Sequence, residues 1–178
     1  MPNATPPLVT IVGRKDAGKT TWVVRLAAAL GRRGHRVMTI KHGSHTFNID
    51  PATTDTYRHY HEGEAERVAM LAPDKFAMIM RVDGSQWSAA DIATQYMSDA
   101  DIVLCEGFKA SDLQRIEVHR QSLGAAPLYL ADAERAAYYR AIVTDAEALD
   151  VPIPVIPLNA PDAVDQLVRL VEHQIMHR

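Results

Sequence analysis

The chain has 178 residues, of which 47% are hydrophobic, and a formal net charge of −3 at pH 7. This length fits one globular domain with a full core, so we expect a short disordered lead at residues 1–7 and a single domain at residues 8–178. Both signs of charge are interspersed and no apolar run approaches the roughly 20 residues of a membrane span, which argues against nucleic-acid and membrane partners. The single cysteine, Cys105, excludes an internal disulfide and suggests a cytoplasmic protein.

Predicted strands and helices alternate along the chain. The apolar runs that predict strands are residues 8–12, 36–41, 101–107, 142–145 and 155–156. The helical patterns follow residue 18 up to Gly34, cover residues 55–62, begin again near residue 88 and cover residues 164–175. Residues 67–71 and 76–80 are apolar with a turn between them, which fits either a hairpin or two neighbouring strands. The alternation predicts an α/β fold, a mostly parallel sheet with helices on both faces.

Residues 13–20 read Gly-Arg-Lys-Asp-Ala-Gly-Lys-Thr and fit the pattern G-x-x-x-x-G-K-[ST] between a predicted strand and a predicted helix. Such a loop wraps a nucleotide's phosphates with backbone N–H groups, while Lys19 reaches the β and γ phosphates and Thr20 offers a hydroxyl to Mg²⁺. The pattern predicts a P-loop NTPase. The candidate nucleotide-binding residues of this segment are Gly13, Asp16, Ala17, Gly18, Lys19, Thr20 and Thr21.

The predicted strand at residues 101–107 ends in an acid and a glycine, Glu106 and Gly107. A P-loop enzyme needs an acid at the end of a neighbouring parallel strand to hold Mg²⁺ or its water shell. We therefore expect Thr20 and Glu106 to bind the metal and Lys19 and Glu106 to serve catalysis. The alternative is an ordinary solvated carboxylate at a strand end.

Further candidates follow other strands. Lys41, Arg58 and Lys109 are cations that would contact phosphates, or else belong to solvated loops. Asp145 would accept hydrogen bonds from guanine, or else cap a turn. Four histidines, at positions 42, 45, 59 and 61, suggest a metal site, but no cysteine pair lies nearby and this hypothesis is disfavoured. Cys105 is expected in the core.

The order of these motifs resembles the MobB family, the molybdopterin-guanine dinucleotide biosynthesis protein B. The resemblance covers roughly residues 8–160. It is carried by the P-loop, Lys41-His42 with His45 and Asp50, the segment Asp55-Thr56-Tyr57-Arg58, the segment Glu106-Gly107-Phe108-Lys109 and residues 116–120. The resemblance implies a protein that binds GTP with Mg²⁺ and has weak GTPase activity. Such a protein would form a homodimer and act beside the molybdopterin guanylyltransferase. Molybdopterin is a further candidate ligand. The chain departs from the family pattern at Asp16-Ala17.

Two other functions share this fold. The first is a small-molecule kinase or an ATP-dependent enzyme like dethiobiotin synthase, which also places Glu-Gly after a buried strand. The second is a pure binding module, in which the nucleotide orders a surface for a partner. The chain has no Arg-rich lid, which favours the slow GTPase over the kinase. It also lacks the N-K-x-D guanine signature, so the choice of guanine depends on the family resemblance.

Overall fold

The computed structural model describes residues 4–43, 50–83 and 87–177. The chain divides into two compact units. The first consists of Met1–His42 together with Ser88–Arg178, and the second consists of Gly43–Trp87. Each unit is described by itself, and the expectation of one domain over residues 8–178 stays a prediction. In the parts of the chain that are described, no helix has the length and apolar character needed to cross a membrane.

The first unit contains a six-stranded sheet in the order β2-β5-β1-β6-β7-β8. Every pairing in it is parallel. The strands are β1 (Leu8–Val12), β2 (Val37–Lys41), β5 (Ile102–Glu106), β6 (Arg115–His119), β7 (Tyr139–Thr144) and β8 (Val155–Pro157). Because parallel strands end at the same edge of a sheet, the segments that follow β1, β2, β5, β6 and β7 meet there, where open α/β sheets bind their ligands.

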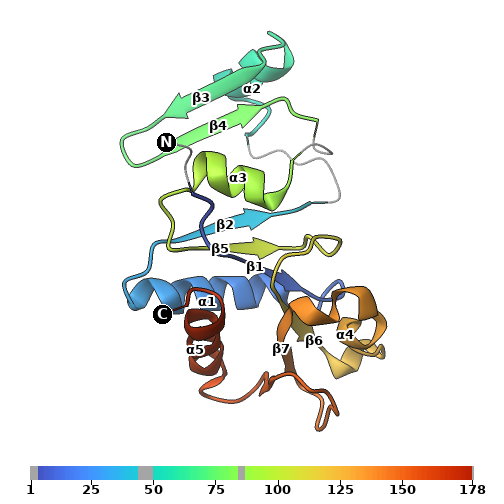
Figure 1. The fold of residues 1–178 in the computed structure, drawn as a ribbon. Helices are drawn as coiled ribbons and strands as arrows, with labels where there is room; N and C mark the ends of the chain where they lie inside the picture. Colours follow the sequence, from blue (N-terminus) through green and yellow to red (C-terminus); the bar gives the residue numbers. More distant parts are fainter. Residues whose placement is uncertain (1–3, 44–49, 84–86, 178) are drawn as a thin grey trace. The chain divides into compact units, whose positions relative to one another are not determined.

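Helices cover both faces of this sheet (Figure 1). On one face, α1 (Lys19–Arg32) and α5 (Ala163–Gln174) bury a stripe that includes Trp22, Leu26 and Leu167. On the other face, α3 (Ala89–Tyr96) packs Ala89 and Ala93 against β2 and β5. It begins at the predicted place, near residue 88, with a capping box between Ser88 and Asp91. The expected α/β architecture is thereby confirmed.

The second unit contains α2 (Asp55–His61) and a two-stranded sheet. β3 (Arg67–Leu71) pairs antiparallel with β4 (Phe76–Met80), so the two apolar segments form a hairpin and not separate neighbours. Thr54 begins α2, because its hydroxyl accepts the N–H of Tyr57 at 3.2 Å. Most of the hairpin's apolar side chains are exposed, including Leu71 at 82% and Phe76 at 63%.

The sequence analysis did not assign β6 to a strand, although its alternation of polar and apolar residues is typical of a half-buried strand. Ile116 and Val118 join the core beneath α1 and α5. The alternate residues Arg115, Glu117 and His119 point to the opposite face, and all three are buried. A strand with such a pattern normally has a solvated face. Here that face is covered by the connection to β7, which consists of η2 (Gln121–Leu123), α4 (Leu128–Ala131) and η3 (Ala133–Tyr138).

Hydrogen bonds to the backbone hold this connection over β6. The two oxygens of Glu117 accept the N–H groups of Leu128 and Tyr129 at 2.6 and 2.9 Å. Burial raises the pKa of the Glu117 carboxyl, and these two donors oppose the rise. The His119 ring lies 2.9 Å from the carbonyl oxygen of Ala125. Arg115 donates to the carbonyl of Lys109 at 3.1 Å and pairs with Asp132 at 3.3 Å.

Candidate functional site

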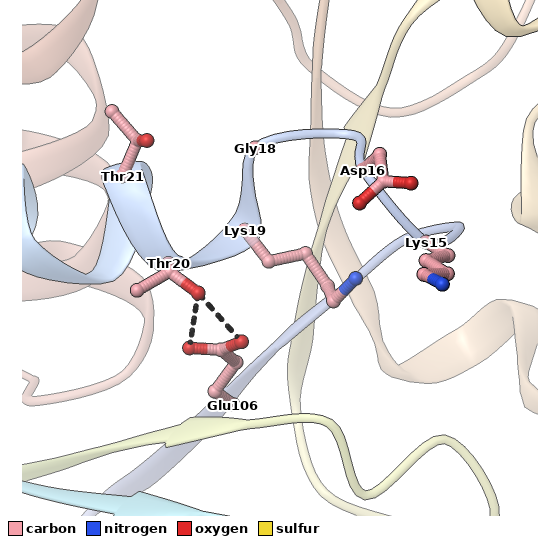
Figure 2. Close-up of a pocket in the computed structure, with 7 residues that line it drawn as sticks. All are labelled: Lys15, Asp16, Gly18, Lys19, Thr20, Thr21 and Glu106. Atoms are coloured by element: carbon pink, nitrogen blue, oxygen red, sulfur yellow. Dashed lines mark hydrogen bonds between the residues drawn. The ribbon is translucent and has the colours of Figure 1, made fainter.

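The predicted phosphate loop runs from the end of β1 to the start of α1. A pocket of about 360 Å³ lies against it, lined by Lys15, Asp16, Gly18, Lys19, Thr20, Thr21 and Glu106 (Figure 2). Gly13 passes so close to β6 that a Cβ atom there would lie 2.4 Å from the carbonyl oxygen of Val118. At the other end of the loop, Gly18 precedes the first turn of α1 with φ 94°, and no side chain caps that turn. The unpaired N–H groups of a helix start favour an anion.

Glu106 and Thr20 meet at the floor of this pocket. The Thr20 hydroxyl lies 2.8 Å from Oε1 and 2.9 Å from Oε2 of Glu106, and Figure 2 shows the two side chains pointing at one another. The Nζ atom of Lys41, at the end of β2, lies 3.2 Å from Oε1 of the same carboxylate. The pairing of Ile11 with Glu106 sets this arrangement, because it aligns the end of β5 with the start of the loop.

The ammonium group of Lys19 lies on its own loop, where it donates to the carbonyl of Arg14 at 2.8 Å. The pKa of Lys19 is lowered, first by burial and then by the positive charge of Lys109, with Lys41 adding to the effect. Glu106 and Asp16 oppose this shift. Several cations thus surround one carboxylate at the pocket, which is the electrostatic setting that attracts a polyphosphate.

Hydroxyl and carboxylate oxygens of this geometry suit Mg²⁺. The ion prefers hard oxygen ligands, and neighbouring ligands of an octahedral Mg²⁺ lie about 3 Å apart when the bonds are about 2.0–2.1 Å. The separations of 2.8 and 2.9 Å between Thr20 and Glu106 are close to that value. No group of three His, Cys, Asp or Glu side chains able to hold a metal occurs among the described residues. The remaining ligands would therefore be phosphate oxygens and water.

The structure brings most of the predicted residues of the first unit together. Ala17 is a buried residue of the loop itself. Lys109 is close enough to shift the pKa of Lys19. Asp145 directly follows β7 and lies 3.5 Å from Arg120, which contacts the loop. Arg58 belongs to the second unit, where it pairs with Glu62, the residue that directly follows α2, at 3.0 Å.

Two residues beside the loop are missing from the candidates named from the sequence: Lys15, which lines the pocket, and Arg120, which was quoted only within residues 116–120. The Nε atom of Arg120 donates to the carbonyl of Ala17 at 3.4 Å, and its Nη1 lies 3.5 Å from Oδ2 of Asp145. The available signal was its place directly after residues 116–119, at the same edge of the sheet as the phosphate loop. Because those residues were not recognised as a strand, the position of Arg120 beside β1 was not foreseen.

The histidines have other contacts. The ring of His42 packs on Phe108, with 5.0 Å between the ring centroids. In the second unit, the ring of His61 packs on Tyr57 at 4.1 Å. His45 lies outside the described residues. Cys105 is buried in β5, as expected, and burial raises the pKa of its thiol to about 12.

A protein-family model described as molybdopterin guanine dinucleotide synthesis protein B, MobB, matches residues 8–145. The chain belongs to the MobB family. A molybdopterin-guanine dinucleotide biosynthesis adapter protein of Haemophilus influenzae is 34% identical over 118 residues, which are 66% of this chain and 65% of that protein. The alignment thus spans slightly less than two thirds of that relative's length. An Escherichia coli protein of the same description is 29% identical over 122 residues, 68% of this chain and 70% of its own.

Solved MobB structures share the fold. A crystal structure of molybdopterin-guanine biosynthesis protein B superposes with a TM-score of 0.70 at 26% identity and covers 96% of this chain and 99% of its own. A MobB homologue from Bacillus stearothermophilus, at 22% identity and a TM-score of 0.67, covers the same shares. The segment that matches the MobB family model contains the phosphate loop, Glu106, Arg120 and Asp145.

Proposed function

We propose that this protein is a GTP-binding P-loop adapter in the biosynthesis of molybdopterin guanine dinucleotide, with slow Mg²⁺-dependent GTPase activity. The observation that carries the proposal is the contact between Thr20 and Glu106 at the floor of the loop pocket. It joins the end of the phosphate loop to an acid on the neighbouring parallel strand, which is the pair that P-loop proteins use for Mg²⁺. The adapter role is supported by the descriptions of the relatives from Haemophilus influenzae and Escherichia coli.

Each residue of the pocket has a distinct task in this proposal. Backbone N–H groups of residues 13–18 and the start of α1 bind the β phosphate, and Lys19 exchanges the carbonyl of Arg14 for phosphate oxygens. A Mg²⁺ ion bound there would supply positive charge that stabilises the negative charge of the phosphates. Thr20 and Glu106 are the residues that would hold that ion or its water shell. Lys109 adds positive charge next to Lys19, where negative charge develops during hydrolysis.

The choice of guanine depends on the family. A dinucleotide that contains GMP is the product named for the relatives, and GTP is the substrate from which GMP is transferred in such chemistry. We propose that the protein works beside the molybdopterin guanylyltransferase, and molybdopterin itself is a further candidate ligand. A cytoplasmic location stays a prediction.

We further propose that the protein forms a symmetric homodimer. In the second unit, the β3–β4 hairpin leaves Met70, Leu71, Phe76 and Met78 exposed, at 55%, 82%, 63% and 39%. Large apolar side chains gathered on one short hairpin favour burial against a partner surface. A two-fold interface is the commonest way for identical chains to provide such a surface.

Isothermal titration calorimetry with GTP and ATP, in the presence and absence of Mg²⁺, tests the nucleotide assignment. We expect GTP to bind more tightly than ATP, and Lys19→Ala to abolish binding while the far-ultraviolet circular dichroism spectrum is unchanged. Lys75→Ala is the matched control, because Lys75 is an exposed lysine of the hairpin turn that pairs with Asp74. Undiminished GTP binding by Lys19→Ala would refute the phosphate-loop assignment. Tighter binding of ATP than GTP would favour the kinase or ATP-dependent enzyme class instead.

A further inference from the structure

Arg120 lies against the end of the phosphate loop. It follows β6 directly, and β6 is the neighbour of β1 on the side away from β5. Besides the 3.4 Å contact of its Nε with the carbonyl of Ala17, its Nη2 would lie 3.7 Å from a Cβ atom placed on Gly18. The guanidinium group therefore sits beside the residue that precedes the first turn of α1, and Gly18 itself lines the pocket.

The guanidinium group is held on one side and has donors left on the other. Its Nη1 pairs with Asp145 at 3.5 Å and its Nε contacts Ala17, whereas its Nη2 has no hydrogen-bond acceptor among the described residues. The side chain is 34% exposed, so it is open to a ligand. Both contacts are long for charge-assisted hydrogen bonds, which are normally about 2.7–2.9 Å. Its neighbours thus orient Arg120 but leave some of its hydrogen-bond donors available to a ligand.

Asp145 is fixed by the backbone on the other side of this pair. Its Oδ1 accepts the N–H of Gln121 at 2.7 Å, and its Oδ2 faces Arg120. The Gln121 N–H and, to a lesser degree, Arg120 hold the pKa of this carboxyl below its usual value. A carboxylate that reads guanine must direct its two oxygens at N1–H and the amino group of the base, but here one oxygen is engaged with the chain and the other with Arg120.

We propose that Arg120 is a phosphate-contacting residue of the nucleotide site, and that Asp145 is the positioning residue that holds it there instead of a reader of the guanine base. The inference rests on the proposed nucleotide-binding function and deepens it. The ligand is the phosphate chain of a nucleoside di- or triphosphate. A guanidinium beside the positive end of α1 adds a directional donor pair at the point where backbone N–H groups already attract phosphate.

Calorimetric titrations with Mg²⁺ and GDP, which avoid hydrolysis, test this assignment. We expect Arg120→Ala to weaken GDP binding by about 10- to 100-fold, the range for loss of a charge-assisted hydrogen bond. Arg120→Lys keeps the charge without the planar fork and should recover part of the loss. Asp145→Asn should weaken GDP binding less than Arg120→Ala does. In the double variant the two effects should not add, because Asp145 acts through Arg120.

Inosine diphosphate separates the two roles of Asp145, since it lacks the amino group of guanine. If Asp145 only positions Arg120, the ratio of GDP to inosine diphosphate affinity is the same in wild type and Asp145→Asn. A collapse of that ratio in Asp145→Asn would assign Asp145 to the base and overturn the positioning role. Wild-type GDP affinity in a folded Arg120→Ala variant, while Lys19→Ala fails to bind, would overturn the inference and leave the proposed function standing. Failure of the wild-type protein to bind any nucleotide would overturn the proposed function itself.

Discussion

Replacing Gly13 by alanine is expected to damage both the fold and the proposed nucleotide site. The added Cβ atom would lie 2.4 Å from the carbonyl oxygen of Val118 and 3.4 Å from its carbonyl carbon. An ordinary contact is roughly 3.5 Å, so the clash is about 1 Å deep. Val118 is fully buried in β6, between β1 and β7, and its carbonyl cannot withdraw without disturbing the sheet. Gly13 also has φ 152°, a value that residues with side chains rarely adopt.

The magnitude follows from these two costs. Overpacking in a rigid core costs about 1–3 kcal/mol, and an unfavourable backbone conformation costs about 1–3 kcal/mol more. For a chain of this size, 1 kcal/mol lowers the melting temperature by about 2–4 °C, so Gly13→Ala should melt roughly 5–20 °C below wild type. Thermal unfolding followed by circular dichroism measures the shift. Calorimetry with GDP should show weakened binding as well, because relief of the clash moves the start of the phosphate loop.

Variants at two other glycines separate the cost of the clash with Val118 from the cost of a positive φ. Gly34 has φ 89° but an added Cβ atom would meet nothing within 4 Å, so Gly34→Ala carries the backbone cost alone. Gly31 lies in the last turn of α1, also with nothing within 4 Å, and Gly31→Ala should raise stability by about 0.5–1 kcal/mol. We expect the melting temperature to be highest for Gly31→Ala, followed by wild type and then Gly34→Ala, and lowest for Gly13→Ala. If Gly13→Ala melts together with Gly34→Ala, the reasoning about Val118 is wrong.

Three further predictions concern the pocket, the core and the hairpin. Glu106→Gln should slow GTP hydrolysis at saturating GTP and Mg²⁺ more than it weakens GTP binding, because it removes the negative charge that orients the ion; an unchanged single-turnover rate would contradict this. Cys105 is buried and the pKa of its thiol is about 12, so at pH 8 only about one thiol in 10⁴ is ionised. Labelling with iodoacetamide, followed by mass spectrometry, should therefore be slow in the native protein and complete in denaturant. Rapid native labelling would show that β5 opens. Light scattering should give a mass of twice 19.7 kDa for wild type and a lower mass for the double variant Leu71→Asp, Phe76→Asp. A constant mass of 19.7 kDa for wild type would reject the homodimer.

The parts of the site that could be predicted from sequence are those determined by local pattern. An apolar run before the loop and helical spacing after it identify β1 and α1, and the apolar run that ends in Glu106 identifies β5. The pairing of these strands then follows from the chemistry, because Thr20 needs an acid nearby. The structure places Thr20 and Glu106 within hydrogen-bonding distance, in agreement with that expectation.

The parts that could not be predicted depend on contacts between distant segments. Charged residues at alternate positions of β6 look like a solvated edge, and only the connection that folds over them makes them buried. That connection has short turns of helix in place of a long amphipathic one, so it has no periodic signal. Arg120 was overlooked for the same reason, since its contact with Ala17 joins segments 103 residues apart.

The charged face of β6 also bears on how this half of the molecule folds. A covering segment held by apolar packing can shift by a residue and lose little, because apolar contacts have no direction. The segment from Gln121 to Tyr138 is held by single pairings: the Glu117 carboxylate matches two particular N–H groups, the His119 ring faces the carbonyl of Ala125, and Arg115 pairs with Asp132. In any shifted alignment these groups would be buried without partners, at a cost of about 1–3 kcal/mol each. The polar face of β6 thereby selects a single position for the segment that covers it. That segment joins β6, which Arg120 follows, to β7, which Asp145 follows.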